Sequence, residues 1–124
     1  MIQLTAADGH RFSAYRAEPK GKPKGALIVV MEIFGVNSHI KKVTDEYAAD
    51  GYLSIAPAMF DRVQPGLDIG YTPPDIEIGR GIMQKIKLVI ENRAGATPSS
   101  VMCLMTFSVS SILSQPNTQF TCSA

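Results

Sequence analysis

Residues Ala26–Asn37, ALIVVMEIFGVN, join an apolar run to a loop, and this stretch decides the fold class. The run is continuous and rich in β-branched residues, so we expect a strand over Ala26–Met31, buried on both faces of a parallel sheet. Glu32 ends the run, and Gly35 and Asn37 supply loop conformations before a helix begins. Because α/β proteins keep their sites at the carboxyl ends of parallel strands, Glu32 is either a functional carboxylate or a solvated charge that closes a strand.

A helix and a second strand follow. Asn37 or Ser38 can cap the helix, and Gly51 is suited to the position just past its end. Apolar residues recur at helical spacing, namely Ile40, Val43, Tyr47 and Ala48, and charged residues take the opposite face. Tyr52–Ala56, YLSIA, then reads as a short strand stopped by Pro57. Strand, helix and strand predict a right-handed parallel βαβ unit, so the predicted fold class is α/β.

A β-hairpin is predicted before this unit. Its strands are Ile2–Leu4 and Phe12–Ala17, and the Asp8-Gly9 dipeptide between them suits a turn that needs positive φ. Glu18–Gly25 alternates Pro and Gly with lysine and cannot sustain a helix or a central strand. We therefore expect an exposed connector between the hairpin and the apolar run.

The segment after the second strand is rich in turn formers. Met59–Pro74, MFDRVQPGLDIGYTPP, should leave the sheet on the same side as Glu32. Helical spacing returns over Asp75–Ile90, although Gly79 and Gly81 weaken the first turns by about 1 kcal/mol each. We therefore expect a loop and then a second helix.

The composition changes after Arg93. No charged residue follows it, Ser and Thr become frequent, and both cysteines, Cys103 and Cys122, appear there. Val101–Val109, VMCLMTFSV, has the composition of an apolar strand, whereas residues 110–124 are mostly polar.

The bulk numbers predict one globular domain. The chain has 124 residues, 45% of them hydrophobic and 19% charged, with a formal net charge of +1. This balance favours neither a nucleic acid nor an anionic membrane as partner, and the spaced residues Lys20, Lys22 and Lys24 read as a solvated turn.

The sequence lacks the patterns of a secretory signal and of a metal site, and these absences give the predictions for location and cofactors. The start, MIQLTAADGHRF, has no apolar core after a basic region, so it does not read as a secretory signal, and a cytoplasmic location is expected. Two cysteines are too few for a disulfide framework, and no Cys or His pair has zinc-finger spacing. We therefore expect no metal site and no cofactor.

Several short motifs together resemble the dienelactone hydrolase family, a branch of the α/β-hydrolase fold. They are EIFG after a strand, N-x-H-I at the helix start, A-A-D-G-Y, A-P and F-D-R, all within Gly25–Gly66. The resemblance continues weakly back to the hairpin sequence DGHRFSAY and forward through Gly70 and Tyr71 to about Leu88. It covers the first two-thirds of the chain and implies the first part of an α/β-hydrolase fold.

The resemblance also implies roles for two residues. The family's EIFG glutamate, matched by Glu32, lies beside a nucleophilic cysteine thiol and takes part in its activation. The amide of the next residue, matched by Ile33, helps to form the oxyanion hole, which stabilises charge that develops in the transition state. The implied reaction is hydrolysis of a small-molecule ester or lactone through a covalent acyl-enzyme.

The sequence departs from the family pattern at the nucleophile. The family's G-x-C-x-G elbow is absent, and the family's later Asp and His have no counterpart. Cys103 stands between Val101 and Met105, where glycines would be needed, and it reads as an incidental buried thiol.

Four other polar residues receive structural interpretations first. His10 reads as hairpin surface and His39 as a residue of the first helical turn. Arg62 and Arg80 are candidates for contacting an acidic substrate, but such arginines more often solvate a surface.

Two hypotheses follow. In the first, residues 1–88 are a partial dienelactone-hydrolase-like domain and residues 89–124 an atypical Ser/Thr-rich tail, frameshifted or disordered, so that the chain descends from a hydrolase and is inactive alone. In the second, the chain is a non-catalytic binding or interaction module that keeps the front of the fold and uses the tail to cover the exposed sheet. A sheet cut before its central strands are complete leaves an apolar edge and face unprotected, which favours self-association over a stable monomer.

Overall fold

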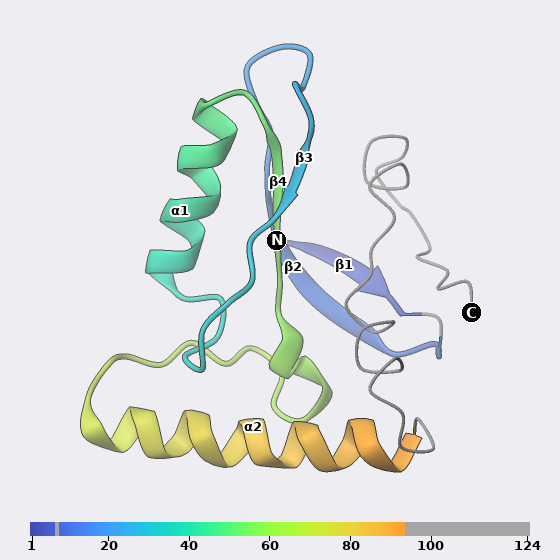
Figure 1. Cartoon of the computed structure of the whole chain (residues 1–124), viewed down its shortest axis with the longest axis vertical. Helices are drawn as coiled ribbons and strands as arrows, with labels where there is room; N and C mark the ends of the chain where they lie inside the picture. The colour runs from blue at the N-terminus through green and yellow to red at the C-terminus, as the bar shows by residue number, and fades with distance from the viewer. Residues whose placement is uncertain (7, 94–124) are drawn as a thin grey trace.

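The computed structural model describes residues 1–6 and 8–93, which form a four-stranded mixed sheet with helices (Figure 1). The strands are β1 (Ile2–Thr5), β2 (Arg11–Ala17), β3 (Ala26–Ile28) and β4 (Leu53–Pro57), in the order β1-β2-β4-β3. The helices are α1 (Ser38–Ala49), the short 3₁₀ helix η1 (Met59–Arg62) and α2 (Pro73–Arg93). The candidate strand Val101–Val109 lies outside the described residues.

The pairing of the strands confirms the predicted α/β class. β1 and β2 form an antiparallel hairpin in which Leu4 faces Phe12, and β2 continues antiparallel onto β4. β3 and β4 are parallel, with Ala26 opposite Leu53, and α1 connects them. A hairpin followed by a parallel βαβ unit is therefore the observed topology, as the sequence predicted.

The prediction for β3 is wrong in length and in burial. The strand ends at Ile28 instead of Met31, and although the Val29 amide still donates to the Ile55 carbonyl at 2.8 Å, Val30 is 68% exposed. The physical reason is position, because β3 lies at the edge of the described sheet and is half-buried. Apolar composition alone does not distinguish an edge strand from a central one.

Both ends of helix α1 are formed by residues that the sequence indicated, an N-capping side chain and a glycine just past the last turn. Asn37, not Ser38, is the N-cap, and its side chain accepts a hydrogen bond from the Ile40 amide at 3.1 Å. Gly51 follows the C-cap residue Asp50 with φ of 99°, a conformation that glycine adopts without steric cost.

One residue expected on the buried face of α1 is not there. Tyr47 is 43% exposed, and Thr44 is fully buried instead, with its hydroxyl donating to the Ile40 carbonyl at 2.7 Å. Because that bond satisfies the hydroxyl within the helix, a threonine can lie on the face that packs against β2 and β4.

Three apolar clusters hold the elements together. One face of the sheet buries Leu4, Ala14, Leu53 and Ile55. A second cluster lies between α1 and the sheet and consists of Val29, Val36, Ile40 and Ala56. The third cluster joins α2 to η1 and the loop after it through Phe60, Leu67 and Ile82. Figure 1 shows α2 crossing beyond the carboxyl ends of β3 and β4, the end from which both connecting loops emerge.

Helix α2 is longer than its apolar spacing predicted, since it starts at Pro73 instead of Asp75 and ends at Arg93. Proline suits a first turn, where its missing amide hydrogen costs no intrahelical bond. Within the part of the chain that the structure describes, no helix is both long and apolar enough to span a bilayer.

A hydrogen bond from Tyr15 of β2 to Asp45 of α1 predicts a measurable titration. The phenol donates to the Asp45 carboxylate at 2.9 Å, and this bond, with burial and the nearby negative charge, raises the pKa of Tyr15 above its ordinary value of 10.0. The pKa of Tyr15 is therefore higher in the folded chain than in the unfolded chain. Its hydrogen bond contributes fully to the stability of the fold below the unfolded-state pKa, and this contribution is lost as the pH rises through the folded-state pKa. Titration of tyrosine absorbance should show one phenol moving to lower pH in Asp45→Asn. An unchanged titration would contradict the assignment, and Tyr15→Phe identifies the phenol concerned.

Candidate functional site

Glu32 and Ile33 lie in the loop that leaves β3. Glu32 is exposed and forms an isolated antiparallel bridge with Gly35, so the chain reverses tightly over Glu32, Ile33, Phe34 and Gly35. The Gly35 amide donates to the Glu32 carbonyl at 3.4 Å across this reversal. The two residues are therefore held in a backbone turn at the carboxyl end of a parallel strand.

Gly35 lets the loop after η1 approach the turn. Its φ is +83°, and a Cβ there would lie 2.1 Å from the Leu67 carbonyl oxygen, so no other residue fits without moving the backbone. Two more backbone contacts join the same loop to the turn. Gly35 forms an isolated antiparallel bridge with Asp68, and the Ile69 amide donates to the Phe34 carbonyl at 3.2 Å. The turn is thus fixed from one side by residues 67–69.

Gly79 fixes the turn from a second direction. A Cβ at Gly79 would lie 2.4 Å from the Ile33 carbonyl oxygen, so α2 packs directly against the backbone of the turn. The sequence showed this glycine only as a weakness of the helix. Its lack of a side chain is what allows α2 to contact Ile33.

The hydrogen bond from the Gly35 amide to the Glu32 carbonyl determines the direction of the Ile33 N–H. In a trans peptide the carbonyl and the following N–H point in opposite directions. The Glu32 carbonyl faces inward to the Gly35 amide, so the Ile33 N–H faces out of the turn. Within residues 1–6 and 8–93 this N–H has no hydrogen-bond acceptor. A fixed, unpaired amide of this kind can donate to an anionic oxygen.

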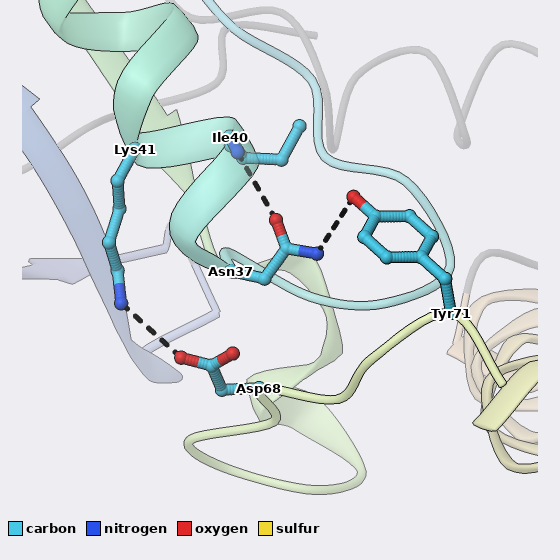
Figure 2. A network of polar contacts seen from close by, with 5 residues as sticks. All are labelled: Asn37, Ile40, Lys41, Asp68 and Tyr71. Carbon is cyan, nitrogen blue, oxygen red and sulfur yellow. Dashed lines mark hydrogen bonds and ion pairs between the residues drawn. The ribbon is translucent and has the colours of Figure 1, made fainter.

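Tyr71 connects the Glu32 carboxylate to the start of α1. Its hydroxyl lies 3.4 Å from Glu32 Oε2 and 3.1 Å from Asn37 Nδ2, and its ring contacts Phe34 with centroids 4.4 Å apart. Figure 2 shows Asn37 between the Ile40 amide and Tyr71, with Lys41 reaching Asp68 from the next turn of the helix. Loop and helix thus meet around the candidate site.

A buried carboxylate holds the start of the same loop. Asp61 in η1 is 6% exposed and accepts hydrogen bonds from the Ser13 amide at 2.8 Å and the Gly66 amide at 3.0 Å. It therefore ties the loop to β2 through two charge-assisted bonds, which are stronger than bonds between neutral groups. By contrast, the ion pair of Lys41 with Asp68 is exposed, and such a pair contributes about 1 kcal/mol or less.

The other candidate residues lie away from Glu32 or have structural partners. Arg62 forms two hydrogen bonds with Asp8 of the hairpin turn, at 2.8 and 3.2 Å, and Arg80 pairs with Glu77 one turn earlier on α2. His10 stacks on Phe12 in the hairpin, and His39 is exposed in the first turn of α1. Cys103 and Cys122 lie outside the described residues.

Sequence reasoning missed the roles of Tyr71, Asn37 and Asp61. The sequence indicates Asn37 as a loop residue, as one of two candidate helix caps and as the start of the motif N-x-H-I, and Tyr71 as part of a Gly-Tyr pair, but it indicates no contact between them. The motif F-D-R contained Asp61, but nothing in the local pattern indicates that its carboxylate is buried. A buried aspartate can be inferred only when its partner amides are known.

Two glycines of α2 provide a matched test of the contact with Ile33. Gly79→Ala should lower the free energy of unfolding by about 1–3 kcal/mol, because its Cβ overlaps the Ile33 carbonyl. A Cβ added at Gly81 would meet nothing within 4 Å, so Gly81→Ala should raise the free energy by about 0.5–1 kcal/mol through helix propensity. Urea denaturation measures both. Equal effects of the two substitutions would show that α2 does not press on the turn.

Comparison with known proteins identifies the family. The model of the dienelactone hydrolase family matches residues 12–112, most of the chain and beyond Leu88, where the motif resemblance faded. A Synechocystis sp. protein provisionally named a carboxymethylenebutenolidase is 49% identical over 71 residues, which are 56% of this chain and 29% of the relative. The carboxymethylenebutenolidase of Pseudomonas putida is 31% identical over 65 residues, covering 52% of this chain and 28% of that protein.

A solved structure also matches. It is a crystal structure from Klebsiella pneumoniae, provisionally named a dienelactone hydrolase, with 27% identity and a TM-score of 0.49, covering 77% of this chain and 44% of that one. The chain thus spans less than a third of the two named relatives and under half of this structure. The match over residues 12–112 confirms the resemblance carried by EIFG and its companion motifs, and the chain belongs to the dienelactone hydrolase family.

Proposed function

We propose that this chain carries one wall of the active site of a hydrolase that acts on a small-molecule ester or lactone. The single observation behind the proposal is the turn at Glu32 and Ile33, where an amide without an acceptor among the described residues stands next to a carboxylate at the end of β3. Family membership supplies the reaction class, and the name of the Pseudomonas putida relative denotes hydrolysis of a butenolide, which is a lactone.

In this proposal the Ile33 amide is an oxyanion-hole donor. The tetrahedral intermediate of acyl transfer places negative charge on the former carbonyl oxygen, and a pre-oriented N–H stabilises that charge without reorganising. The contacts of Gly35 with Leu67 and of Gly79 with Ile33 support this role, because they hold the peptide before any substrate binds.

Glu32 in this proposal assists the nucleophilic thiol. An exposed carboxylate beside the oxyanion donor is positioned to accept a proton or a hydrogen bond from a cysteine that attacks the same carbonyl. The thiolate would attack the carbonyl carbon and break the acyl C–O bond, so that the alkoxide leaves, or stays tethered to the acyl group in a lactone, and takes up the proton that the thiol gave to Glu32. Water would then cleave the thioester, which releases the acid and restores the thiol.

The nucleophile itself is not provided by a recognisable motif. The 124 residues contain neither G-x-C-x-G nor G-x-S-x-G, and no histidine follows His39. We therefore infer that the chain alone does not hydrolyse esters. We propose residues 1–88, which carry the family motifs, as its hydrolase-like unit, while the family match itself continues to residue 112. Translation of the other two reading frames of the gene past Leu88 tests the origin of residues 89–124, since a frameshift predicts an elbow motif there.

A chimera tests the roles of Glu32 and Ile33. Residues 25–71 of this chain should replace the aligned segment of the Pseudomonas putida carboxymethylenebutenolidase, whose lactone hydrolysis is then measured. Ile33→Pro removes the amide hydrogen and should lower kcat about 10²–10³-fold, the usual loss for one oxyanion donor, whereas Ile33→Ala keeps that hydrogen and should retain the rate. Glu32→Gln should also lower kcat.

Folding of each chimera is checked by circular dichroism before its rate is compared. Chimeras with Ile33→Pro and Glu32→Gln that fold and hydrolyse the lactone as fast as the unsubstituted chimera would overturn the proposal.

A second candidate function is an interaction module, favoured by the open edge of β3. Among the described strands β3 pairs only with β4, and Val30 beyond it is 68% exposed. An unpaired strand edge is a template for association. Sedimentation of the whole chain distinguishes the two functions, because a soluble species of defined size with a cooperative melt indicates a self-contained module, whereas non-specific aggregation indicates a partial enzyme.

A further inference from the structure

The Asn37 amide group has only one orientation compatible with its neighbours. Asn37 is 4% exposed, and one of its terminal atoms lies 3.1 Å from the backbone nitrogen of Ile40. A backbone N–H can only donate, so the atom that faces it must be the amide oxygen. The NH₂ group therefore faces Tyr71, at 3.1 Å (Figure 2).

This orientation sets the direction of the next hydrogen bond. The NH₂ group of Asn37 can only donate, so the Tyr71 oxygen must accept there. The phenol has one hydrogen, which is then left for its other neighbour, Glu32 Oε2, at 3.4 Å. An ionised carboxylate is an acceptor only, so donor and acceptor types match along the whole chain of contacts.

The tyrosine ring is held independently of its hydroxyl. It packs on Phe34, with the ring planes inclined at 57°, and Phe34 is itself paired through its carbonyl to the Ile69 amide. Gly70 then leads directly into Tyr71, which remains 53% exposed. The hydroxyl thus reaches Glu32 from a loop anchored to the same turn that carries Glu32.

We propose that Tyr71 is a positioning residue that holds Glu32 Oε2, and that the α1 cap Asn37 imposes the direction of this hydrogen-bond relay. Oε2 is then held by Tyr71, and Oε1, which has no hydrogen-bond partner among the described residues, is free to accept a hydrogen bond from a thiol. The consequence for catalysis rests on the proposed function, whereas the relay itself is a property of the folded chain.

Carboxyl-carbon NMR of the full chain, labelled with ¹³C-glutamate, tests the relay directly. Glu32→Gln assigns the Glu32 signal by its disappearance. Tyr71→Phe keeps the ring on Phe34 but removes the donor, so the Glu32 signal should shift. Tyr47→Phe, on the exposed face of α1, is the matched control and should leave the signal in place.

Asn37→Asp tests the direction of the relay. The new carboxylate still caps the Ile40 amide, but it presents an acceptor to Tyr71 and draws the phenol hydrogen away from Glu32. The Glu32 signal should then shift as it does in Tyr71→Phe, with the helical circular dichroism retained. Because the added charge acts on Glu32 by itself, the same substitution is also made in Tyr71→Phe, where no phenol hydrogen remains to be redirected. The relay predicts a smaller shift from Asn37→Asp in that background, and equal shifts in the two backgrounds would show that Asn37 does not set the direction.

The outcomes separate the relay from the proposed function. A Glu32 signal that stays in place in folded Tyr71→Phe overturns the relay, whatever the chimera assay gives. A shift in both Tyr71→Phe and Asn37→Asp, but not in Tyr47→Phe, supports it. Full lactone hydrolysis by the Glu32→Gln chimera overturns the proposed function and leaves the relay standing.

Discussion

The close backbone contact at Gly35 is the constraint on which the candidate site depends. A residue with a side chain would place its Cβ 2.1 Å from the Leu67 carbonyl oxygen, and the backbone there has the positive φ that glycine tolerates. Without that contact the loop after η1 would not reach the turn that follows β3. Neither the bridge of Gly35 to Asp68 nor the approach of Tyr71 to Glu32 would then form.

The packing of α2 extends the same constraint. Gly79 allows the helix to approach the Ile33 carbonyl, and Ile82 and Phe60 bury apolar surface next to it. Burial of these apolar side chains supplies favourable free energy of folding. Because Gly35 and Gly79 have no side chain, the same packing can hold the backbone amide of Ile33 in a fixed position. Apolar packing thereby holds the Ile33 N–H in place, with no polar contact to this N–H from residues 1–6 and 8–93.

The loop 59–72 connects this packing to α1. Asp61 ties its start to β2, and Tyr71 near its end meets Asn37, the cap of the helix. A single asparagine thus has two uses, since its oxygen satisfies the first turn of α1 and its nitrogen orients a tyrosine. A substitution in the loop or at the start of α1 is therefore expected to alter the hydrogen bonding of Glu32, because Asn37, Tyr71 and Glu32 are joined in sequence by hydrogen bonds.

The sequence by itself determined the local elements. The Asp8-Gly9 turn, the cap before Ser38, Gly51 after α1 and the apolar residues of β4 all act within a few residues, and their patterns predicted the hairpin and the parallel unit. The motif set around EIFG also identified the family. The burial of β3 and of Tyr47 was predicted wrongly, because each depends on which neighbouring element covers it.

Only the tertiary structure decided the environment of Glu32 and Ile33. Tyr71, Leu67 and Gly79 are far from the turn in the chain, and their contacts with it follow from how the loop and α2 fold back across the carboxyl ends of β3 and β4. Periodicity and turn propensity report interactions between residues close in sequence. The orientation of an amide and the partner of a carboxylate depend on residues brought together by packing, and for that reason they appeared only in three dimensions.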